Sequence, residues 1–297
     1  MSDGQIVAIP TETVYGLAAD ATNAEAVASI YAAKSRPAIN PLIVHVADIN
    51  AAQDIAAFSD DALDLAEAFW PGPLTLVLPK HPSATIAGIV SAGLDSIAIR
   101  CPAHPAARSL LSAFNRPLAA PSANPSGKIT STSADHVLDG LDGQIAAVLD
   151  AGPCELGLES TIVGLTGSAP TLLRPGGLPA EQITDCIGKP LERAKPSATP
   201  NAPGQLASHY APDATIRLEA FEKRPDEHHI GFGSVKGDVS LSPNGDLVEA
   251  AARLFDLLHR CDQTGVQKIA VAPIPDSGLG RAINDRLARA AAPRSAV

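Results

Sequence analysis

Short apolar runs that read as strands alternate with Ala- and Leu-rich stretches that read as helices along most of this 297-residue chain. Strands are predicted at residues 6–9, 42–46, 74–78, 96–100, 145–149, 160–165 and 268–272. Helices are predicted at residues 24–33, 60–69, 105–114, 247–261 and 281–291. A chain that alternates the two element types covers its sheet with helices, so the pattern predicts an α/β fold. The alternation is too irregular to predict a doubly wound parallel sheet.

Composition narrows the function classes. Hydrophobic residues make up 45 % of the chain and aromatic residues only 3 %, so the core must consist mostly of Ala, Val, Ile and Leu. The formal net charge of −10 argues against a nucleic-acid coat or a membrane-surface protein. The four cysteines are scattered without metal-ligand spacing, which supports neither disulfides nor structural zinc. We expect no membrane span and no secretion signal, and therefore a cytoplasmic location.

The composition changes at "KPSATPNAPGQLASHYAP", residues 195–212. Prolines, alanines and small polar residues in this proportion are typical of an extended, semi-rigid linker. The chain is therefore predicted to form a larger domain at 1–192, a linker at 193–212 and a small α/β domain at 213–297.

Common nucleotide-binding loops do not fit the sequence. "SGKIT" at 126–130 resembles the end of a phosphate-binding loop, but Ser122 stands where that loop requires glycine. "GFGSVKG" at 231–237 has the wrong spacing for a dinucleotide site and reads as a tight turn. No metal-ligand motif is present either.

Polar residues at predicted strand ends and in loops form the remaining candidate site. They are Lys34, Arg36, Asn40, His45, Arg100, Ser122, Asn124, Ser160 and Arg174. Ligands of open α/β sheets bind at strand ends. A lysine and three arginines gathered there would repel one another without an anion, and a polyphosphate would resolve that conflict.

Each candidate also has a purely structural explanation. Lys34 and Arg36 suit a helix C-terminus, where cations are favoured. His45 suits a buried strand as a satisfied core histidine. The other positions suit turns, caps or surface loops: Thr13, Ser122, Asn124 and Arg174.

Six motifs occur in an order that resembles the Sua5/YrdC family of threonylcarbamoyl-AMP synthases. They are "IPTETVYGLAADA", "KSRPAINPLIVHV", "WPGPLTLVL", "APSANPSG", "GLESTIV" and "LLRPGG". The resemblance is dense over residues 5–190 and continues through "HYAP", "GFG" and "IPDSGLGRAINDRLARAA", which indicates the two-domain Sua5 type. It implies a YrdC-like twisted, open mixed sheet with a concave cleft, followed by a small Rossmann-like Sua5 domain. Members usually carry a helix before the first strand, whereas this chain begins almost at the strand, and its C-terminal domain is expected to be short between Phe221 and Leu247.

The resemblance implies a reaction in which L-threonine, bicarbonate (or CO2) and ATP give L-threonylcarbamoyladenylate and pyrophosphate. A separate transferase complex uses the product to form N6-threonylcarbamoyladenosine in tRNA. Mg²⁺ is expected to arrive with ATP and to need few protein ligands.

The same motifs assign the site residues. The ATP side is Lys34, Arg36, Asn40, Ser96, Asn124, Thr132, Arg174 and Tyr210, of which Lys34 and Arg36 are the catalytic residues. The threonine side is Thr13, His45, Arg100, Ser122 and Ser160. Tyr210 would lie over the pocket and make the linker a lid.

Two other functions would use some of the same sequence features. A double-stranded RNA- or tRNA-binding module would use the same cationic crevice, but the acidic net charge and scarce aromatics disfavour it. The carbamoyl-adenylating module of hydrogenase maturation would bring an acylphosphatase-like segment and zinc motifs, which the sequence lacks.

Overall fold

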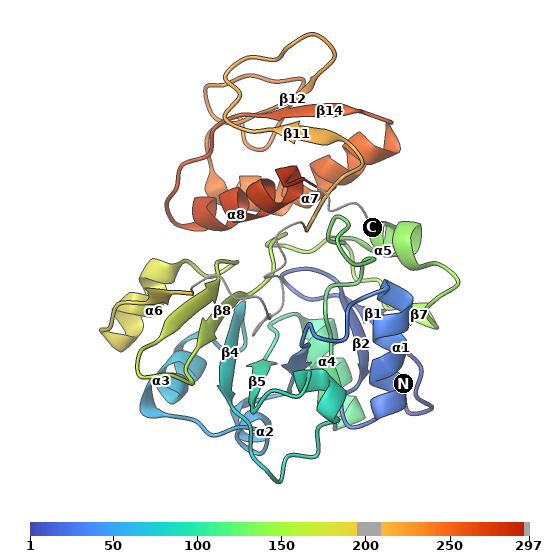
Figure 1. Ribbon diagram of the computed structural model, residues 1–297, viewed down its shortest axis with the longest axis vertical. Helices are drawn as coiled ribbons and strands as arrows, with labels where there is room; N and C mark the ends of the chain where they lie inside the picture. The colour runs from blue at the N-terminus through green and yellow to red at the C-terminus, as the bar shows by residue number, and fades with distance from the viewer. Residues whose placement is uncertain (195–208, 294–297) are drawn as a thin grey trace.

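A computed structural model of the protein describes residues 1–194 and 209–293 (Figure 1). The strands of the larger sheet are β1 (Val7–Ile9), β2 (Gly16–Asp20), β3 (Ile43–His45), β4 (Leu74–Pro79), β5 (Ser96–Arg100), β6 (Leu118–Ala119), β7 (Ala147–Val148), β8 (Thr161–Gly164), β9 (Thr171–Arg174) and β10 (Glu192–Arg193). Its helices are α1 (Ala24–Lys34), α2 (Ile49–Gln53), α3 (Asp60–Phe69), the 3-10 helix η1 (Gly88–Ser91), α4 (Pro105–Phe114), α5 (Ala134–Leu141) and α6 (Ala180–Ile187). The C-terminal elements are β11 (Thr215–Arg217), β12 (His228–Gly231), β13 (Val239–Ser240), α7 (Leu247–Gln263), β14 (Lys268–Val271) and α8 (Leu279–Ala291).

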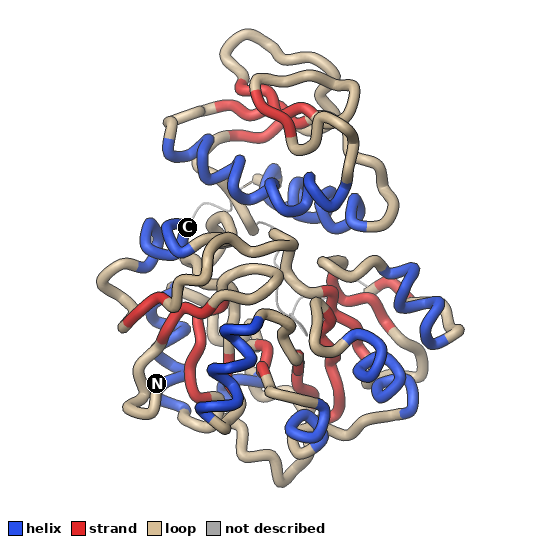
Figure 2. Tube along the Cα trace, turned by 180° about the vertical axis from the view of Figure 1, so that it is seen from behind, coloured by secondary structure: helices blue, strands red, loops and turns tan. Residues whose placement is uncertain are grey.

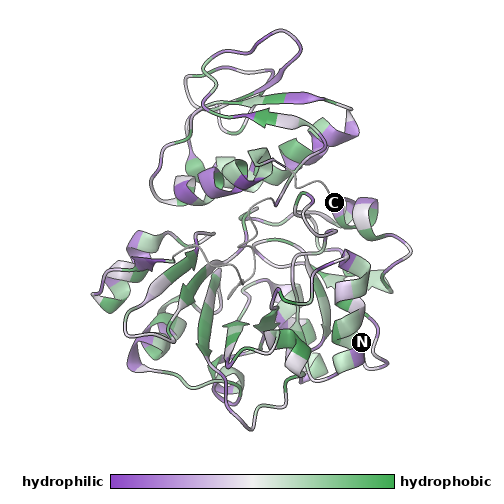
Figure 3. Cartoon of the chain, in the orientation of Figure 1, coloured by the Kyte–Doolittle hydropathy of each residue, from purple (hydrophilic) through white to green (hydrophobic). Residues whose placement is uncertain are grey.

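The larger sheet is mixed and open. Its strand order is β10-β9-β8-β4-β5-β3-β6-β2-β1-β7. β3/β5 and β4/β8 run parallel, whereas β4/β5 and β3/β6 run antiparallel. Figure 3 shows the central strands as the most hydrophobic part, in agreement with a core built mainly from Ala, Val, Ile and Leu. The predicted α/β fold with a mixed sheet is therefore confirmed.

The C-terminal elements form a second sheet of order β11-β14-β12-β13, in which every pair is parallel. Figures 1 and 2 show α7 and α8 between this sheet and the larger part of the protein. Their apolar sides form a separate core that also includes Ile129, Leu158 and Tyr210. The imidazoles of His136 on α5 and His259 on α7 stack across the boundary with ring centroids 3.9 Å apart. The second α/β unit expected from the sequence is present and packs on the first.

Several elements match their predicted ranges because their local signals are strong. α3, β5 and α4 begin and end where predicted, and Asn23 caps α1 by accepting hydrogen bonds from the backbone N–H groups of Glu25 and Ala26. The strand β2 and the helices α5 and α6 were not predicted from the sequence. The β2 sequence, GLAAD, has no β-branched residue, so only its interior place in the sheet, between β6 and β1, makes it a strand.

The register of two parallel strands places the candidate residues at opposite ends. β3 and β5 pair Ile43 with Ala98 and His45 with Arg100. His45 and Arg100 therefore share the carboxyl end of the strand pair, whereas Ser96 lies at the other end of β5.

The described residues bear only in part on the predicted linker and on the expected absence of a membrane span. Residues 195–208 of the predicted linker lie outside the described residues, so the boundaries at 192 and 212 stay a prediction. In the part of the chain that the structure describes, no helix has both the length and the apolar character needed to cross a membrane.

Candidate active site

Lys34 stands at the C-terminus of α1, where the chain leaves the helix through Ser35 in the left-handed region (φ 49°). The side chain is buried, and its Nζ donates to the carbonyl oxygen of Ser122 at 2.6 Å and to that of Asn124. Lys34 thus holds the "APSANPSG" loop against α1. Burial, and then the neighbouring charge of Arg36, place the pKa of Lys34 well below its usual range.

Arg36 and Asn40 form a second buried group beside it. The Arg36 guanidinium donates to the carbonyl oxygens of Asn40 (3.3 Å) and Pro41 (3.0 Å). Burial lowers the pKa of Arg36 to about 10, and Arg174 adds to that effect. The Asn40 carboxamide is fully buried, and neither its oxygen nor its nitrogen has a hydrogen-bond partner among the described residues. Because unpartnered buried amides are costly, this side chain points to a polar ligand.

Arg174 and Ser160 meet where β9 passes the start of β8. The Arg174 guanidinium donates to the Ser160 carbonyl oxygen at 2.8 Å, and the Ser160 hydroxyl lies 2.7 Å from that of Thr75. Gly176 permits this close approach, since a Cβ there would lie 2.3 Å from the carbonyl oxygen of Glu159. The interpretation of Arg174 as a surface loop residue is therefore wrong, because the side chain is 5 % exposed.

Glu159 lies among these cations, although it was not among the site residues predicted from the sequence. Its carboxylate accepts from the Thr130 hydroxyl (2.7 Å) and from Arg286 Nε (2.8 Å). Burial alone would raise the pKa of Glu159, but Arg286 and Arg174 outweigh it and hold the pKa at about 2. Glu159 also acts on Lys34, whose pKa it raises. An ionised carboxylate thus balances part of the positive charge.

A third group lies at the carboxyl ends of β3 and β5. Arg100 donates to the Thr13 hydroxyl (2.8 Å) and forms a buried ion pair with Glu12 (2.6 Å). His45 is buried beside them, and burial together with the Arg100 charge lowers its pKa to about 3. The neutral ring lies with Nδ1 3.2 Å from the Ile43 carbonyl oxygen, so Nδ1 donates and Nε2 is left as an acceptor. Glu12, too, was not among the site residues predicted from the sequence.

Residues 209–211 are held between the two parts of the protein. The His209 N–H donates to the Arg289 carbonyl oxygen of α8, and the Ala211 N–H donates to that of Gly127. Tyr210 adopts φ 63°, an unfavourable conformation for a bulky side chain, and is 1 % exposed. Its ring lies 5.6 Å from that of Phe255 and 5.1 Å from the Arg286 guanidinium. Burial lowers the pKa of His209 to about 3, and the neighbouring cations Lys34, Arg36 and Arg286 add to that effect.

The structure therefore brings together two groups of candidates. The cationic group is Lys34, Arg36, Arg174 and Ser160 with the backbone of Ser122 and Asn124, and the second is Thr13, His45 and Arg100. Ser96 lies half-buried at the amino end of β5. The Thr132 hydroxyl lies 3.3 Å from the His136 imidazole, toward the C-terminal unit. Arg100 is held by Glu12 instead of joining the cationic group directly.

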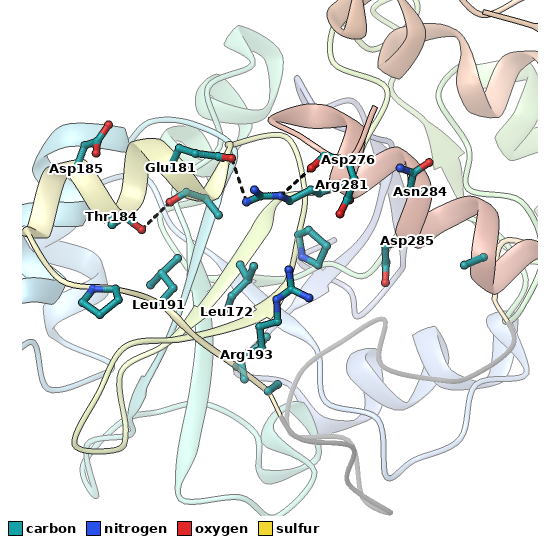
Figure 4. Close-up of a pocket in the computed structure, with 16 residues that line it drawn as sticks. Leu172, Glu181, Thr184, Asp185, Leu191, Arg193, Asp276, Arg281, Asn284 and Asp285 are labelled. Carbon is teal, nitrogen blue, oxygen red and sulfur yellow. Dashed lines mark hydrogen bonds and ion pairs between the residues drawn. The ribbon is translucent and has the colours of Figure 1, made fainter. Parts of the chain in front are cut away.

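A cavity of about 790 Å³ lies next to the cationic group, between β9, α6 and α8 (Figure 4). Arg281 of α8 spans it and pairs with Glu181 of α6 at 3.0 Å. Its described lining contains none of the predicted site residues. The candidate site is thus the buried polar cluster, and this cavity is a neighbouring interdomain space.

Comparisons with known proteins agree with this architecture. A family model described as "Telomere recombination" (Sua5_yciO_yrdC) matches residues 1–176, and one described as "Threonylcarbamoyl-AMP synthase, C-terminal domain" (Sua5_C) matches residues 178–292. The threonylcarbamoyl-AMP synthase of Pyrococcus abyssi is 43 % identical over 97 % of this chain and 91 % of its own length. That of Bacillus subtilis is 41 % identical over 99 % of this chain and 91 % of its own length.

A solved structure shows the same arrangement of both parts. The crystal structure of P. abyssi Sua5 complexed with L-threonine superposes with a TM-score of 0.90, at 40 % identity, over 97 % of this chain and 91 % of that one. The family models, the relatives and this superposition each span both parts of the protein. The chain therefore belongs to the Sua5/YrdC family, as a two-domain member of the Sua5 type.

Proposed function

We propose that this protein is an L-threonylcarbamoyladenylate synthase, which joins L-threonine, bicarbonate (or CO2) and ATP and releases pyrophosphate. The observation that carries the proposal is the buried cationic group: Lys34, Arg36 and Arg174 are buried against backbone carbonyl oxygens, as suits a triphosphate, and the nearby Asn40 carboxamide has no hydrogen-bond partner among the described residues. A second buried group supplies the hydroxyl, imidazole and guanidinium suited to a small amino acid. Relatives similar over nearly the whole chain carry that name, and a similar structure is described with L-threonine bound.

The threonine side suits an amine that must be unprotonated to react. His45 is neutral at pH 7, since its pKa is about 3, and offers Nε2 as an acceptor for an amine N–H. Arg100, held in place by Glu12 and Thr13, is the cation assigned to the carboxylate, and Thr13 and Ser122 supply hydroxyls. Once the nitrogen has lost a proton and added CO2, the carbamate oxygen attacks the α-phosphorus and pyrophosphate leaves.

The nucleotide side works by position and charge. Lys34, Arg36 and Arg174 offset the charge on the triphosphate oxygens, and a protonated Lys34 keeps one N–H donor beyond its two backbone contacts. Asn40 offers its unpartnered carboxamide to the nucleotide. Positioning and charge stabilisation need no protein nucleophile. The remaining residues assigned to the ATP side are Ser96, Asn124, Thr132 and Tyr210.

Mg²⁺ would enter as part of the ATP complex. Among the residues that the structure describes, no group of three or more His, Cys, Asp or Glu side chains could hold a metal ion. Mg²⁺ bound to the phosphates of ATP keeps several of its waters and needs few protein ligands.

The remaining parts of the proposal concern the setting. The adenylate passes to a transferase complex that modifies tRNA in the cytoplasm, and the protein itself holds no tRNA stably. Residues 1–192 form the catalytic domain, 193–212 the linker and 213–297 the Sua5 domain. Tyr210 closes the site over the labile adenylate and excludes water.

Pyrophosphate release tests the proposal. With ATP, bicarbonate and each amino acid in turn, we expect release that requires both threonine and bicarbonate. Serine should react less well, since a lost methyl group changes discrimination by about 1 to 3 kcal/mol. Lys34→Ala and Arg36→Ala should abolish release and keep the fold, whereas Lys189→Ala, an exposed lysine paired with Asp61, should not. Release without threonine, or unchanged release in both site variants, would contradict the proposal.

Retention on immobilised tRNA separates the rival function. A tRNA-binding module would be retained at low salt and lost steeply as salt rises. We expect this protein not to be retained on the tRNA, at low salt or at high salt.

A further inference from the structure

Arg286 is the largest fully buried side chain among the described residues, and it comes from the C-terminal unit. Its Nε donates to Glu159 at 2.8 Å, and its Nη1 pairs with Asp285 at 2.7 Å. Its guanidinium lies 5.1 Å from the Tyr210 ring, within the range of a cation–π contact. One side chain of α8 thus contacts both the catalytic part and residue 210.

Glu159 connects Arg286 to the cationic group. Glu159 directly precedes Ser160, whose carbonyl oxygen accepts a hydrogen bond from Arg174. The backbone carbonyl oxygen of Glu159 accepts a hydrogen bond from the Gly177 N–H. Arg286 binds one oxygen of the Glu159 carboxylate, and the other oxygen accepts a hydrogen bond from the Thr130 hydroxyl, which follows the loop that Lys34 holds. A shift of the Glu159 carboxylate would therefore disturb both Thr130 and the adjoining Ser160 backbone that accepts from Arg174.

We propose that Arg286 is a positioning residue, through which the C-terminal domain holds Glu159 and Tyr210 in the arrangement that the reaction needs. The inference rests on the proposed function and assigns the C-terminal domain a part in it. Arg286 acts through these two neighbours. Because misplacement by about 1 Å can cost about 100-fold in rate, losing this contact should lower kcat far more than it lowers affinity for ATP.

The charge of Glu159 provides a readout that a purely structural role would not give. The charged and titratable groups that face its carboxylate are Arg286 from α8, Arg174 from β9, Lys34 from α1, and His209 and Tyr210, and Asp285 lies behind Arg286 as its second ion-pair partner. Arg286 and Arg174 outweigh burial there and keep the pKa at about 2. Without Arg286, burial gains weight and the pKa of Glu159 rises, so protonation begins at a higher pH.

The experiment compares Arg286→Met, Arg286→Lys, Glu159→Gln and the Glu159→Gln/Arg286→Met double variant in the full chain. The matched control is Arg281→Met, which removes another arginine of α8 and its ion pair with Glu181, away from Tyr210. The readouts are threonine-dependent pyrophosphate release from pH 5 to 8 and the thermal midpoint.

Arg286→Met should lose about 100-fold in kcat, with the loss growing as the pH falls. The acidic loss should be absent from the double variant, which has no carboxylate at 159, and from Arg286→Lys, which keeps a cation. The double variant should lose no more than the more impaired single variant, because the two residues act together. Arg281→Met should keep wild-type kcat.

Wild-type kcat in Arg286→Met, or a loss equal at every pH and matched by Arg281→Met, would overturn the inference. If Arg286→Met does not fold, the double variant decides, because it leaves no unpaired charge at 159 and Arg289 still pairs with Asp285. Wild-type kcat in that variant overturns the inference, and a loss like that of Glu159→Gln supports it. A wild-type protein that releases no pyrophosphate overturns the proposed function before any variant is compared.

Discussion

At the scale of single residues, the site depends on buried groups whose charge a ligand would change. Lys34 is 1 % exposed, and burial and Arg36 together lower its pKa well below the usual range. Neither cause acts on an exposed lysine, so the amine of Lys34 gives up its proton more easily. A bound triphosphate would add negative charge beside it and favour the ammonium form.

ATP binding should therefore take up a proton at Lys34. The pKa of Lys34 rises on binding, so uptake occurs between the lower pKa of the free protein and the higher pKa of the complex. Calorimetric titrations at several pH values, in buffers of different ionisation enthalpy, measure the number of protons and the pH range of uptake. Lys34→Met should abolish the uptake, and Lys189→Met should preserve it. Equal uptake in wild type and Lys34→Met would contradict this assignment.

At the scale of elements, the β8–β9 hairpin positions Glu159 and Ser160. The chain after β9 passes so close to the start of β8 that a Cβ on Gly176 would lie 2.3 Å from the Glu159 carbonyl oxygen and 2.4 Å from the Ser160 carbonyl carbon. These are backbone atoms, which cannot move aside as a flexible side chain does. The "LLRPGG" motif thus has a steric reason for glycine.

Gly176→Ala should displace the Glu159–Ser160 backbone. We expect destabilisation of about 1 to 3 kcal/mol, as for other overpacked sites, and loss of turnover beyond that expected from the unfolded fraction. The matched control is Gly167→Ala in the loop of the same hairpin, where a Cβ meets no atom within 4 Å. Urea unfolding and pyrophosphate release check both variants, and equal behaviour of the two would show that close packing at 176 is unimportant.

At the scale of the whole molecule, both parts of the protein bury histidines that resist protonation. Burial lowers the pKa of His45 and His209 to about 3 and that of His259 to about 4, and it also lowers the pKa of His136. Two of the four form the stacked pair across the domain boundary. In the unfolded chain each would titrate near its ordinary value of about 6.5.

Stability should therefore fall on the acid side well above the pKa values of the carboxylates. Above about pH 6.5 the histidines are neutral in both states, whereas below it the unfolded chain binds more protons. Each histidine then contributes up to about 1.4 kcal/mol per pH unit. The thermal midpoint of the wild-type protein should be level from pH 7 to 8 and should decline from about pH 6.5 downward. The decline should be less steep in the His259→Gln variant than in the wild type. A level midpoint down to pH 5 would contradict the burial of these side chains.

A second decline should follow at lower pH. The folded pKa of Glu159 is about 2 and that of Glu12 is also lowered, mainly because Arg286 and Arg100 overcome the effect of burial. Their contribution is complete above the unfolded value and is lost as the pH falls through the folded pKa.

Local signals in the sequence determined much of the framework. The capped α1 and the ranges of α3, β5 and α4 depend on neighbours a few residues away, so they could be predicted. The tertiary structure alone decided that GLAAD forms an interior strand, that Arg100 pairs with Glu12 across 88 positions, and that Arg286 reaches Glu159 across 127. Burying a charge is tolerated only beside a partner, and that partner is chosen by how the sheets and helices pack, which no local pattern records.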